Sequence, residues 1–433
     1  MGLESVGDLI LNAIFTKLGA KDAAKVACVS KSFNVWASED ALWSKFCLED
    51  LDLSAPVDSH GNTAPSFKAA YKLWYGAFGM YPWHLVQRVK RCLDRLKNWL
   101  MTNFPEAATT LRNGVSEAQI DEAEKILKVK LPVSTRILYR FCDGQDLQGK
   151  GFPTTQNGSQ LGLIGGYLFY SHLVNVYLLP LHEVIMKTQH IIRDMGFSKQ
   201  SKFVLVAASS TFIEKLFFLN CNNGQLYVGS RNLVTDGEMM PCVPEGLNKQ
   251  DAMLLWLEEH ARRLEQGVIQ LREQGNVRSI CQFPEAEPFC TTSVTNGVKV
   301  RASAVFVPEL ADLEDDSEKF WFSYSIRISL VPEGCFVSGV YFSSCQLHWR
   351  HWIIRANDRI ISDVNGEGVI GKLPLLRPGE KEYVYESCTP LPTTSGSVEG
   401  YFTFVPGSVA KAKGGPFDVD VARFPLQVPD YLF

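Results

Sequence analysis

The sequence lacks a long apolar run, a strong excess of charge and paired cysteines. No stretch reaches the roughly 18 consecutive apolar residues that a membrane-spanning helix needs. The net charge of the 433-residue chain is only −4, which disfavours a binder of duplex nucleic acid, because phosphate contacts require a basic surface. The eleven cysteines are dispersed without a Cys-x-x-Cys motif, so we expect reduced thiols rather than a disulfide framework.

The first residues also lack the features of a secretory signal, because Glu4 and Asp8 stand where a basic lead-in to an apolar run would be. We therefore expect a cytoplasmic or nuclear location, or both, with no membrane or nucleic-acid partner. A basic run within residues 88–97 is expected on the solvated face of a helix, and a nucleic-acid patch is the alternative. With 46% hydrophobic residues, the chain is long enough for two or three domains.

Residues 1–50 have the pattern of a small helical module. Apolar residues recur at spacings of three and four from Leu3 to Leu18, and Gly19 follows where a helix can end in a left-handed conformation. Further apolar runs follow, and Asp40 opens the last helical segment. About 45 residues bury too little apolar surface to be comfortably stable alone, so we expect a partner protein to complete this cluster.

The order of these residues resembles an F-box, most specifically at residues 26–31 and at Leu42-Trp43. Glu4 departs from the proline that often follows the first leucine in that family. The resemblance implies docking on a Skp-type adaptor and, through it, on a cullin. An ordinary helical cap on the next domain is the alternative. The residues expected to contact the adaptor or to maintain the module, two roles that the spacing leaves unseparated, are Leu3, Leu9, Ile10, Ile14, Val26, Val29, Trp36 and Trp43.

Residues 51–110 are predicted to form a helical connector. Phe67, Trp74 and Phe78 belong to one apolar stripe, Pro82 interrupts it, and a second stripe spans residues 86–100. The connector is expected to hold the next domain at a fixed distance from the adaptor.

Residues 111–271 are predicted to form an α+β domain. Ser116 and Gln119 have the spacing of a capping box. Strand-like pieces follow at residues 167–169, 203–206, 217–219 and 226–228, the last two flanking an Asn-Asn-Gly turn, and a long helix begins near Gln250. This order, with Leu131-Pro132 and Asp143-Gly144, resembles the SUKH superfamily. The resemblance implies a protein-interaction module without a reaction of its own.

Residues 272–286 are interpreted as a linker, because they are rich in polar residues, glycine and proline. Beyond them apolar and polar residues alternate, most clearly over residues 298–306 and 320–330, and turn sequences separate the runs. Such short alternating strands predict an antiparallel β-sandwich. The acidic segment from Glu309 to Lys319 is expected to be a solvated hairpin tip.

Residues 287–433 closely resemble an ApaG domain. The resemblance rests on the segments at 346–354, 366–371, 376–380, 396–402 and 417–421, while Arg355 departs from the family's threonine. It implies a fibronectin type III-like β-sandwich. The whole chain is therefore expected to be multidomain, with helical, α+β and all-β parts in that order.

The glycine run formed by Gly366, Gly368 and Gly371, followed by Lys372, is the candidate anion site, since the ApaG run has been suggested to bind phosphate groups. In a dinucleotide fold such glycines precede a helix whose N-terminus faces the pyrophosphate, but Pro374 disfavours an immediate helix here. A turn or bulge between strands is therefore favoured over an anion-binding nest. We expect no cofactor, no metal and no catalytic centre.

An F-box followed by interaction domains is the layout of a substrate receptor. We therefore expect a non-catalytic substrate-recognition subunit of a Skp–cullin–F-box (SCF) ubiquitin ligase, recruiting an unknown protein for ubiquitination and proteasomal degradation. The mechanism would be proximity, which raises the effective concentration of target lysines near an activated thioester. The alternatives are a non-degradative scaffold that uses the adaptor without cullin, and a phosphate or nucleotide sensor acting through the ApaG domain.

Overall fold

The structure is a computed structural model that describes residues 8–147, 159–169, 172–194, 196–198, 201–210, 215–229, 239–247, 251–274 and 277–433. Its contacts divide the chain into two compact units. The first unit contains Met1–Asn98, Asn113–Glu122 and Leu131–Asp143. The second unit contains Trp99–Arg112, Ala123–Lys130 and Gly144–Phe433. Within the described ranges, no helix combines the length and the hydropathy that crossing a membrane requires.

Three short helices form the beginning of the first unit: α1 (Asp8–Val26), α2 (Lys31–Trp36) and α3 (Asp40–Leu51). Gly19 interrupts α1 with φ 75° and ψ 166°, so the predicted helix break is confirmed at that residue. Ser30 caps α2, because its hydroxyl accepts a hydrogen bond from the amide of Phe33 at 3.2 Å. Asp40 is the first residue of α3, as its position in the sequence predicts.

Helices α4 (Phe67–Phe78) and α5 (Trp83–Asn103) form the predicted helical connector, and a short α6 (Pro105–Ala108) follows. The stripe predicted on α4 is buried, with Trp74 and Phe78 both 1% exposed. Pro82 lies between α4 and α5, where a proline does not remove a helical hydrogen bond.

Helices α7 (Glu117–Leu127) and α8 (Val133–Phe141) follow a short strand β1 (Leu111–Asn113). The capping box is confirmed: the amide of Ser116 donates to the Gln119 side chain at 2.8 Å, and the amide of Gln119 donates to the Ser116 hydroxyl at 3.3 Å. All of α8 and the first part of α7 group with the first unit. The compact units therefore do not divide at the predicted boundary between residues 110 and 111.

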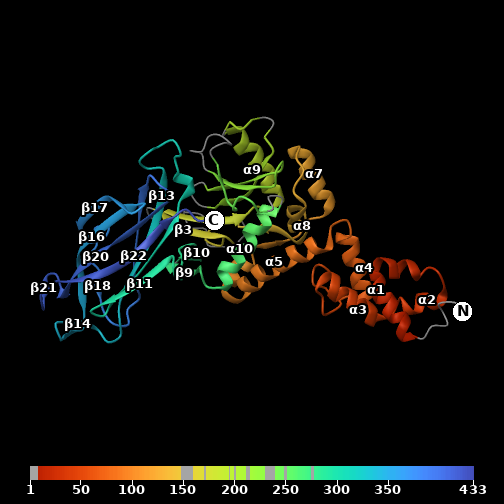
Figure 1. Ribbon diagram of the computed structural model, residues 1–433, viewed down its shortest axis with the longest axis horizontal. Helices are drawn as coiled ribbons and strands as arrows, with labels where there is room; N and C mark the ends of the chain where they lie inside the picture. Colours follow the sequence, from red (N-terminus) through yellow and green to blue (C-terminus); the bar gives the residue numbers. More distant parts are fainter. Residues whose placement is uncertain are drawn as a thin grey trace. The chain divides into compact units, whose positions relative to one another are not determined.

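An eight-stranded mixed sheet forms the core of the second unit, with the order β8-β7-β6-β5-β4-β3-β10-β9 (Figure 1). The β6–β7 pair is antiparallel and confirms the hairpin predicted around its Asn-Asn-Gly turn. Helix α10 (Ala252–Glu265) confirms the predicted long helix. The strands and the remaining helices here are β2 (Cys142–Gln145), β3 (Gly165–Phe169), β4 (His172–Leu178), α9 (Leu181–Asp194), β5 (Phe203–Ser209), β6 (Leu216–Asn220), β7 (Leu226–Gly229), β8 (Met240–Pro241), β9 (Gln270–Gln274) and β10 (Val277–Cys281).

The interpretation of residues 272–286 as a linker is wrong. This segment contains most of β9 and all of β10, and β10 extends the sheet by pairing with β3 in parallel. Phe283 is fully buried, and Glu285 forms ion pairs with Arg272 at 2.9 Å and with Arg301 at 2.8 Å. Part of the polar composition therefore belongs to a buried ion cluster, in which Glu285 compensates the charges of Arg272 and Arg301.

Residues 287–433 form two antiparallel sheets packed face to face. One sheet has the order β11-β12-β13-β19, and the other has the order β17-β16-β20-β21, with β22 also pairing with β20. Tyr324 of β13 and Phe424 of β22 meet between the sheets with their ring centroids 6.0 Å apart. The strands are β11 (Cys290–Thr295), β12 (Val298–Phe306), β13 (Phe320–Leu330), β14 (Cys335–Val337), β15 (Val340–Phe342), β16 (Cys345–Ala356), β17 (Arg359–Glu367), β18 (Leu375–Leu376), β19 (Tyr383–Leu391), β20 (Ser395–Ser408), β21 (Lys411–Ala412) and β22 (Phe417–Gln427).

The acidic segment after β12 is not entirely solvated. A 3₁₀ helix, η3 (Pro308–Leu310), turns Glu309 inward, where it is 2% exposed. Its carboxylate lies 3.6 Å from the ammonium of the buried Lys215 and accepts a hydrogen bond from the Tyr167 hydroxyl at 2.5 Å. The prediction of a solvated tip fails at this residue because two partners remote in sequence compensate its charge.

Candidate functional site

The apolar residues of α1 to α3 separate into a buried set and an exposed set. The buried set forms the core of the helical module, and it consists of Leu11, Phe15, Ala20, Ala23, Ala37, Leu42, Trp43, Phe46, Cys47 and Leu51. The exposed set consists of Ile10, Ile14, Leu18, Val29, Val35 and Leu48. Since the sequence gives both sets similar spacing, only burial distinguishes the side chains that a partner protein could reach.

Ile10, Ile14 and Leu18 form an exposed apolar row on the first half of α1. Their exposed fractions are 54%, 37% and 39%, and their spacing of four places them on one face of the helix. Leu11 and Phe15, one residue further along in each case, are both 2% exposed. A helix that is apolar on its core face and also on an exposed face is typical of a protein-docking surface.

Trp43 belongs to the core and not to the exposed surface, which favours the second of its two expected roles, maintenance of the module. It is 2% exposed, and its indole nitrogen donates to the carbonyl of Ala37 at 2.7 Å. Its ring contacts Phe46 and Tyr71 edge-on, with centroids 5.6 Å and 5.3 Å away. Because Tyr71 lies on α4, Trp43 joins the helical module to the connector.

The other predicted contact residues have mixed positions. Val29 is 71% exposed, whereas Val26 and Trp36 are half-buried. Leu3 lies outside the described residues, and of Leu9 only the backbone, in α1, is described. The ring of Trp36 lies 5.8 Å from that of Phe33, which in turn contacts Phe15. Trp36 therefore borders the core.

Two exposed residues, Val35 and Leu48, were missed by the sequence analysis, with exposed fractions of 68% and 55%. Leu48 lies on α3 outside the set of buried residues of that helix, and α2, which contains Val35, has no buried residue. Both residues could have been identified in the sequence as apolar residues outside a helical stripe, because such a residue does not pack in the core of its own module.

Polar contacts fix α3 against α4. The Asp40 carboxylate accepts a hydrogen bond from the amide of Phe67 at 2.8 Å, and the Tyr71 hydroxyl donates to Asp50 at 2.6 Å. Burial, together with the neighbouring Asp50 carboxylate, raises the pKa of the Tyr71 hydroxyl far above its usual value. The hydroxyl therefore stays protonated and keeps its role as donor.

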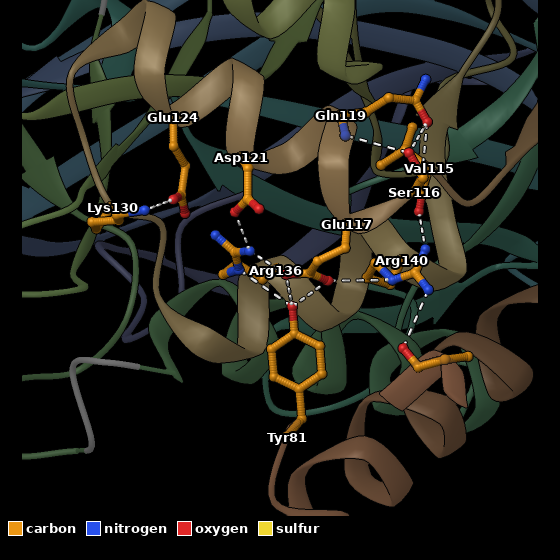
Figure 2. Close-up of polar contacts among 11 residues, drawn as sticks. Tyr81, Val115, Ser116, Glu117, Gln119, Asp121, Glu124, Lys130, Arg136 and Arg140 are labelled. Atoms are coloured by element: carbon orange, nitrogen blue, oxygen red, sulfur yellow. Dashed lines mark hydrogen bonds and ion pairs between the residues drawn. The ribbon is translucent and has the colours of Figure 1, made fainter. Parts of the chain in front are cut away.

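A second polar network joins the connector to α7 and α8 (Figure 2). The Tyr81 hydroxyl, which follows α4, donates to the Glu117 carboxylate at 2.7 Å and accepts from Arg136 at 3.2 Å. Arg136 also pairs with Glu117 directly and with Asp121 at 2.8 Å. Burial raises the pKa of Tyr81 to about 12, so its hydroxyl remains a donor throughout the physiological range.

Arg140 completes this network from α8. Its guanidinium donates to the carbonyl of Val115 and, at 3.2 Å, to the carbonyl of Ala77, and it lies 5.4 Å from the ring centroid of Phe78. Phe141 stacks on Phe78 with a centroid separation of 4.5 Å. These contacts explain why α8 belongs to the same compact unit as the helical module.

The glycine run of residues 366–371 forms a strand end and a tight turn. Gly368 donates from its amide to the carbonyl of His348 at 2.9 Å, while Val369 and Lys372 exchange backbone hydrogen bonds of 2.9 Å and 3.0 Å. Gly366 lies opposite Arg350 in the ladder, and a Cβ there would lie 3.2 Å from the guanidinium. The amides of Gly368, Val369 and Lys372 are therefore engaged within the chain, and no helix follows them.

The side chain of Lys372 lines an open groove of about 440 Å³ together with Arg377 and Lys381. Glu380 and Glu382 line the same groove, and Glu380 pairs with Arg377 at 3.0 Å. Its charges are thus mixed, which does not favour a phosphate. In the portions of the chain that the structure describes, no group of three His, Cys, Asp or Glu side chains is placed to hold a metal ion.

Comparison with known proteins adds the family. The F-box-like family matches residues 8–49, and the ApaG domain family (DUF525) matches residues 311–406. F-box protein SKIP16 from Arabidopsis thaliana is 55% identical over 444 residues, covering 100% of both chains. F-box only protein 3 from Homo sapiens is 25% identical over 434 residues, covering 99% of this chain and 84% of that protein. Protein ApaG from Anaeromyxobacter dehalogenans is 35% identical over 142 residues, covering 33% of this chain and 98% of that protein.

These matches confirm the F-box and ApaG resemblances, while the SUKH resemblance of residues 111–271 stays a prediction. The helices α1 to α3 lie almost entirely within the F-box-like match, and the exposed apolar row lies on its first helix. The similarity to SKIP16 extends over the whole length of the chain. The chain therefore belongs to the family of F-box proteins that includes SKIP16.

Proposed function

We propose that this protein is a non-catalytic substrate receptor of an SCF ubiquitin ligase. Residues 1–50 would dock on a Skp-type adaptor and, through it, on a cullin, and the rest of the chain would hold a target protein for ubiquitination and degradation. The observation that carries the proposal is the row of Ile10, Ile14 and Leu18, which leaves apolar surface exposed on an F-box helix. Burying this row against another protein removes the cost of its exposure to water.

The division of roles follows from burial. We assign adaptor contact to the exposed residues Ile10, Ile14 and Val29. Leu3, Leu9, Val26 and Trp36 stay candidates for adaptor contact from the sequence alone. Trp43 maintains the module by connecting α3 to α4. We further propose that residues 111–271 are a SUKH-like interaction module, and that the protein acts in the cytoplasm, the nucleus or both.

The test is capture of a purified Skp-type adaptor by the full-length chain carrying Ile10→Asp and Ile14→Asp together. We expect affinity to fall by at least about 100-fold, because each lost apolar contact contributes about 1.5 kcal/mol or more. The free energy of unfolding should change by less than about 0.5 kcal/mol per substitution, since both side chains are exposed. Binding would be measured by calorimetry and unfolding by urea denaturation.

Leu73→Asp is the matched control, because Leu73 is 52% exposed on α4, in the connector of the same unit. It should bind adaptor like the unsubstituted chain. Unchanged capture by the double variant would refute the assigned face. Adaptor capture without cullin in reconstituted complexes would support the non-degradative scaffold instead.

A further inference from the structure

The two large sheets of residues 287–433 have four long edge strands in the part of the chain that the structure describes, and three of them are covered. The edge strands β11 and β22 meet through side chains: Ser293 donates to the carbonyl of Asp420 at 2.5 Å, and Thr295 accepts from its amide at 3.2 Å. The third edge strand, β19, lies against β3 of the eight-stranded sheet. Such coverage is how natural sheets prevent uncontrolled pairing with other chains.

Strand β17 is the uncovered edge. It pairs with β16 on one side, and no other strand in the described parts of the chain pairs with it. Figure 1 shows β17 at the outer border of its sheet. Its nine residues include neither lysine nor proline, the usual protective residues of an edge. Ile360, Ile361 and Val364 are 55%, 45% and 37% exposed, so the edge is both open and apolar.

The two faces of β17 differ in chemistry. Val364 lies opposite Trp352 and Ser362 opposite Ile354 in the ladder, and both β16 residues are buried. Val364 therefore continues the core side of the sheet beyond its last covered strand, since alternate residues share a face. The register shifts between Ile354 and Arg355 and sets Ile360 opposite Arg355, so Ile360 lies beyond this alternation.

The other face of β17 is acidic. Asp363 pairs with His351 at 2.7 Å, and Glu367 lies four residues further along on the same face. His351 lies 4.9 Å from the ring of Tyr401 on β20, which places this face on the outside of the sandwich. Over residues 362–367, a neighbouring strand would thus meet Val364 on one face and the two carboxylates on the other.

Building on the proposed substrate-receptor function, we propose that β17 binds an extended segment of the target protein as an added strand. The segment would alternate apolar residues, beside Val364 on the core side, with lysine or arginine residues, beside Asp363 and Glu367. Main-chain hydrogen bonds supply affinity in such strand addition, and alternate side chains supply selectivity. A second copy of the chain fits less well, because antiparallel self-pairing about the strand centre sets Asp363 against Asp363.

The test uses the full-length chain and a fluorescein-labelled peptide of alternating lysine and valine. We expect saturable binding, and slower amide hydrogen exchange confined to residues 359–367. A glutamate-valine peptide should bind at least about tenfold more weakly because its charges repel the acidic face. The lysine-valine peptide with alternate backbone nitrogens methylated should also lose about tenfold or more, because it cannot complete the ladder.

Ile360→Lys with Val364→Lys should weaken binding of the lysine-valine peptide by about tenfold or more, because lysine protects an edge. Val294→Lys on β11 is the matched control, since Val294 is 58% exposed on an edge that is already covered, and it should bind normally. Equal binding by the methylated peptide, or protection outside residues 359–367, would overturn the proposal. If amide exchange of residues 359–367 slows with rising protein concentration in the absence of peptide, the added strand belongs to a second copy of the chain and not to a target protein.

The two proposals fail separately. The Ile360→Lys, Val364→Lys variant should keep its affinity for adaptor, and the Ile10→Asp, Ile14→Asp variant should keep its affinity for peptide. Loss of peptide binding in the second variant would show that β17 is not an independent site.

Discussion

His260 is fully buried on α10, where it contacts the carbonyl of Leu163 through Nε2 at 2.8 Å. Since a carbonyl only accepts, Nε2 carries the proton, and Nδ1 is buried without a hydrogen-bond partner among the described residues. Burial lowers the pKa of His260 to about 4, with the neighbouring Arg263 contributing in the same direction and Glu259 opposing it. The imidazole is therefore neutral in the folded protein at every pH near neutrality.

This residue predicts a loss of stability in acid. The unfolded chain binds a proton at His260 near pH 6.5, whereas the folded chain does so only near pH 4. The stability that the neutral imidazole contributes is complete above about pH 6.5 and disappears as the pH falls towards 4. Between pH 7.5 and 4.5 the cost is about 2.5 kcal/mol, at about 1.4 kcal/mol per pH unit below 6.5.

Urea denaturation at the two pH values measures this cost. His260→Gln is the comparison, because an amide nitrogen can still donate to Leu163 but does not titrate. We expect the variant to lose about 2.5 kcal/mol less than the unsubstituted chain on acidification. Equal losses in the two proteins would contradict a buried, neutral histidine.

At the scale of elements, the ion pairs and the tyrosine hydrogen bond that link α7 and α8 with the connector meet at one carboxylate. Glu117 accepts from Tyr81 and pairs with Arg136 and, at 3.5 Å, with Arg140. The two arginine side chains are only 14% and 17% exposed. Removing the carboxylate charge would leave two nearly buried cations with too little compensation.

Glu117→Gln should therefore destabilise the first unit by about 2 kcal/mol. Far-UV circular dichroism during urea denaturation of the full-length chain would measure the change. Asp121→Asn is the control, since Asp121 is 57% exposed and its pairing with Arg136 is screened by water, and we expect an effect below about 0.5 kcal/mol. A similar small effect for Glu117→Gln would show that the network does not hold the elements together.

At the scale of the whole molecule, residues distant in sequence connect the eight-stranded sheet region with the sandwich inside the second unit. Phe433 stacks on Trp256 of α10 with a centroid separation of 5.5 Å. The guanidinium of Arg263 lies 4.6 Å from the centroid of the Phe433 ring. The indole of Trp256 donates to the carbonyl of Leu432 at 2.7 Å. Lys215, fully buried, donates to the carbonyl of Phe433.

Phe433→Ala should destabilise the second unit by about 3 kcal/mol, the usual cost of removing a well-packed phenylalanine ring. Differential scanning calorimetry of the full-length chain would detect it as a lower transition temperature. Phe289→Ala is a matched control within the same unit, because Phe289 is 43% exposed, and its effect should stay below about 1 kcal/mol. Equal effects would mean that residues 432–433 contribute no packing between the two regions.

The sequence by itself determined the features that depend on neighbours along the chain. The break at Gly19, the capping box of Ser116 and Gln119, and the hairpin between β6 and β7 were all predicted. Each is fixed by the conformational preference or hydrogen bonds of a few adjacent residues. The alternation along β12 and β13 likewise predicted strands. It did not show that β13 is buried on both faces, with Ser323 and Ser325 each 1% exposed.

Only the tertiary structure decided which apolar residues of the F-box face outward, since Ile14 and Phe15 differ in burial but not in hydrophobic character. It also placed β10 beside β3 and turned Glu309 towards Lys215. In each case the deciding partner is remote in sequence. Burial and charge compensation depend on the whole folded chain. The periodicity of a segment indicates only which of its faces must be buried, and not which partner buries it.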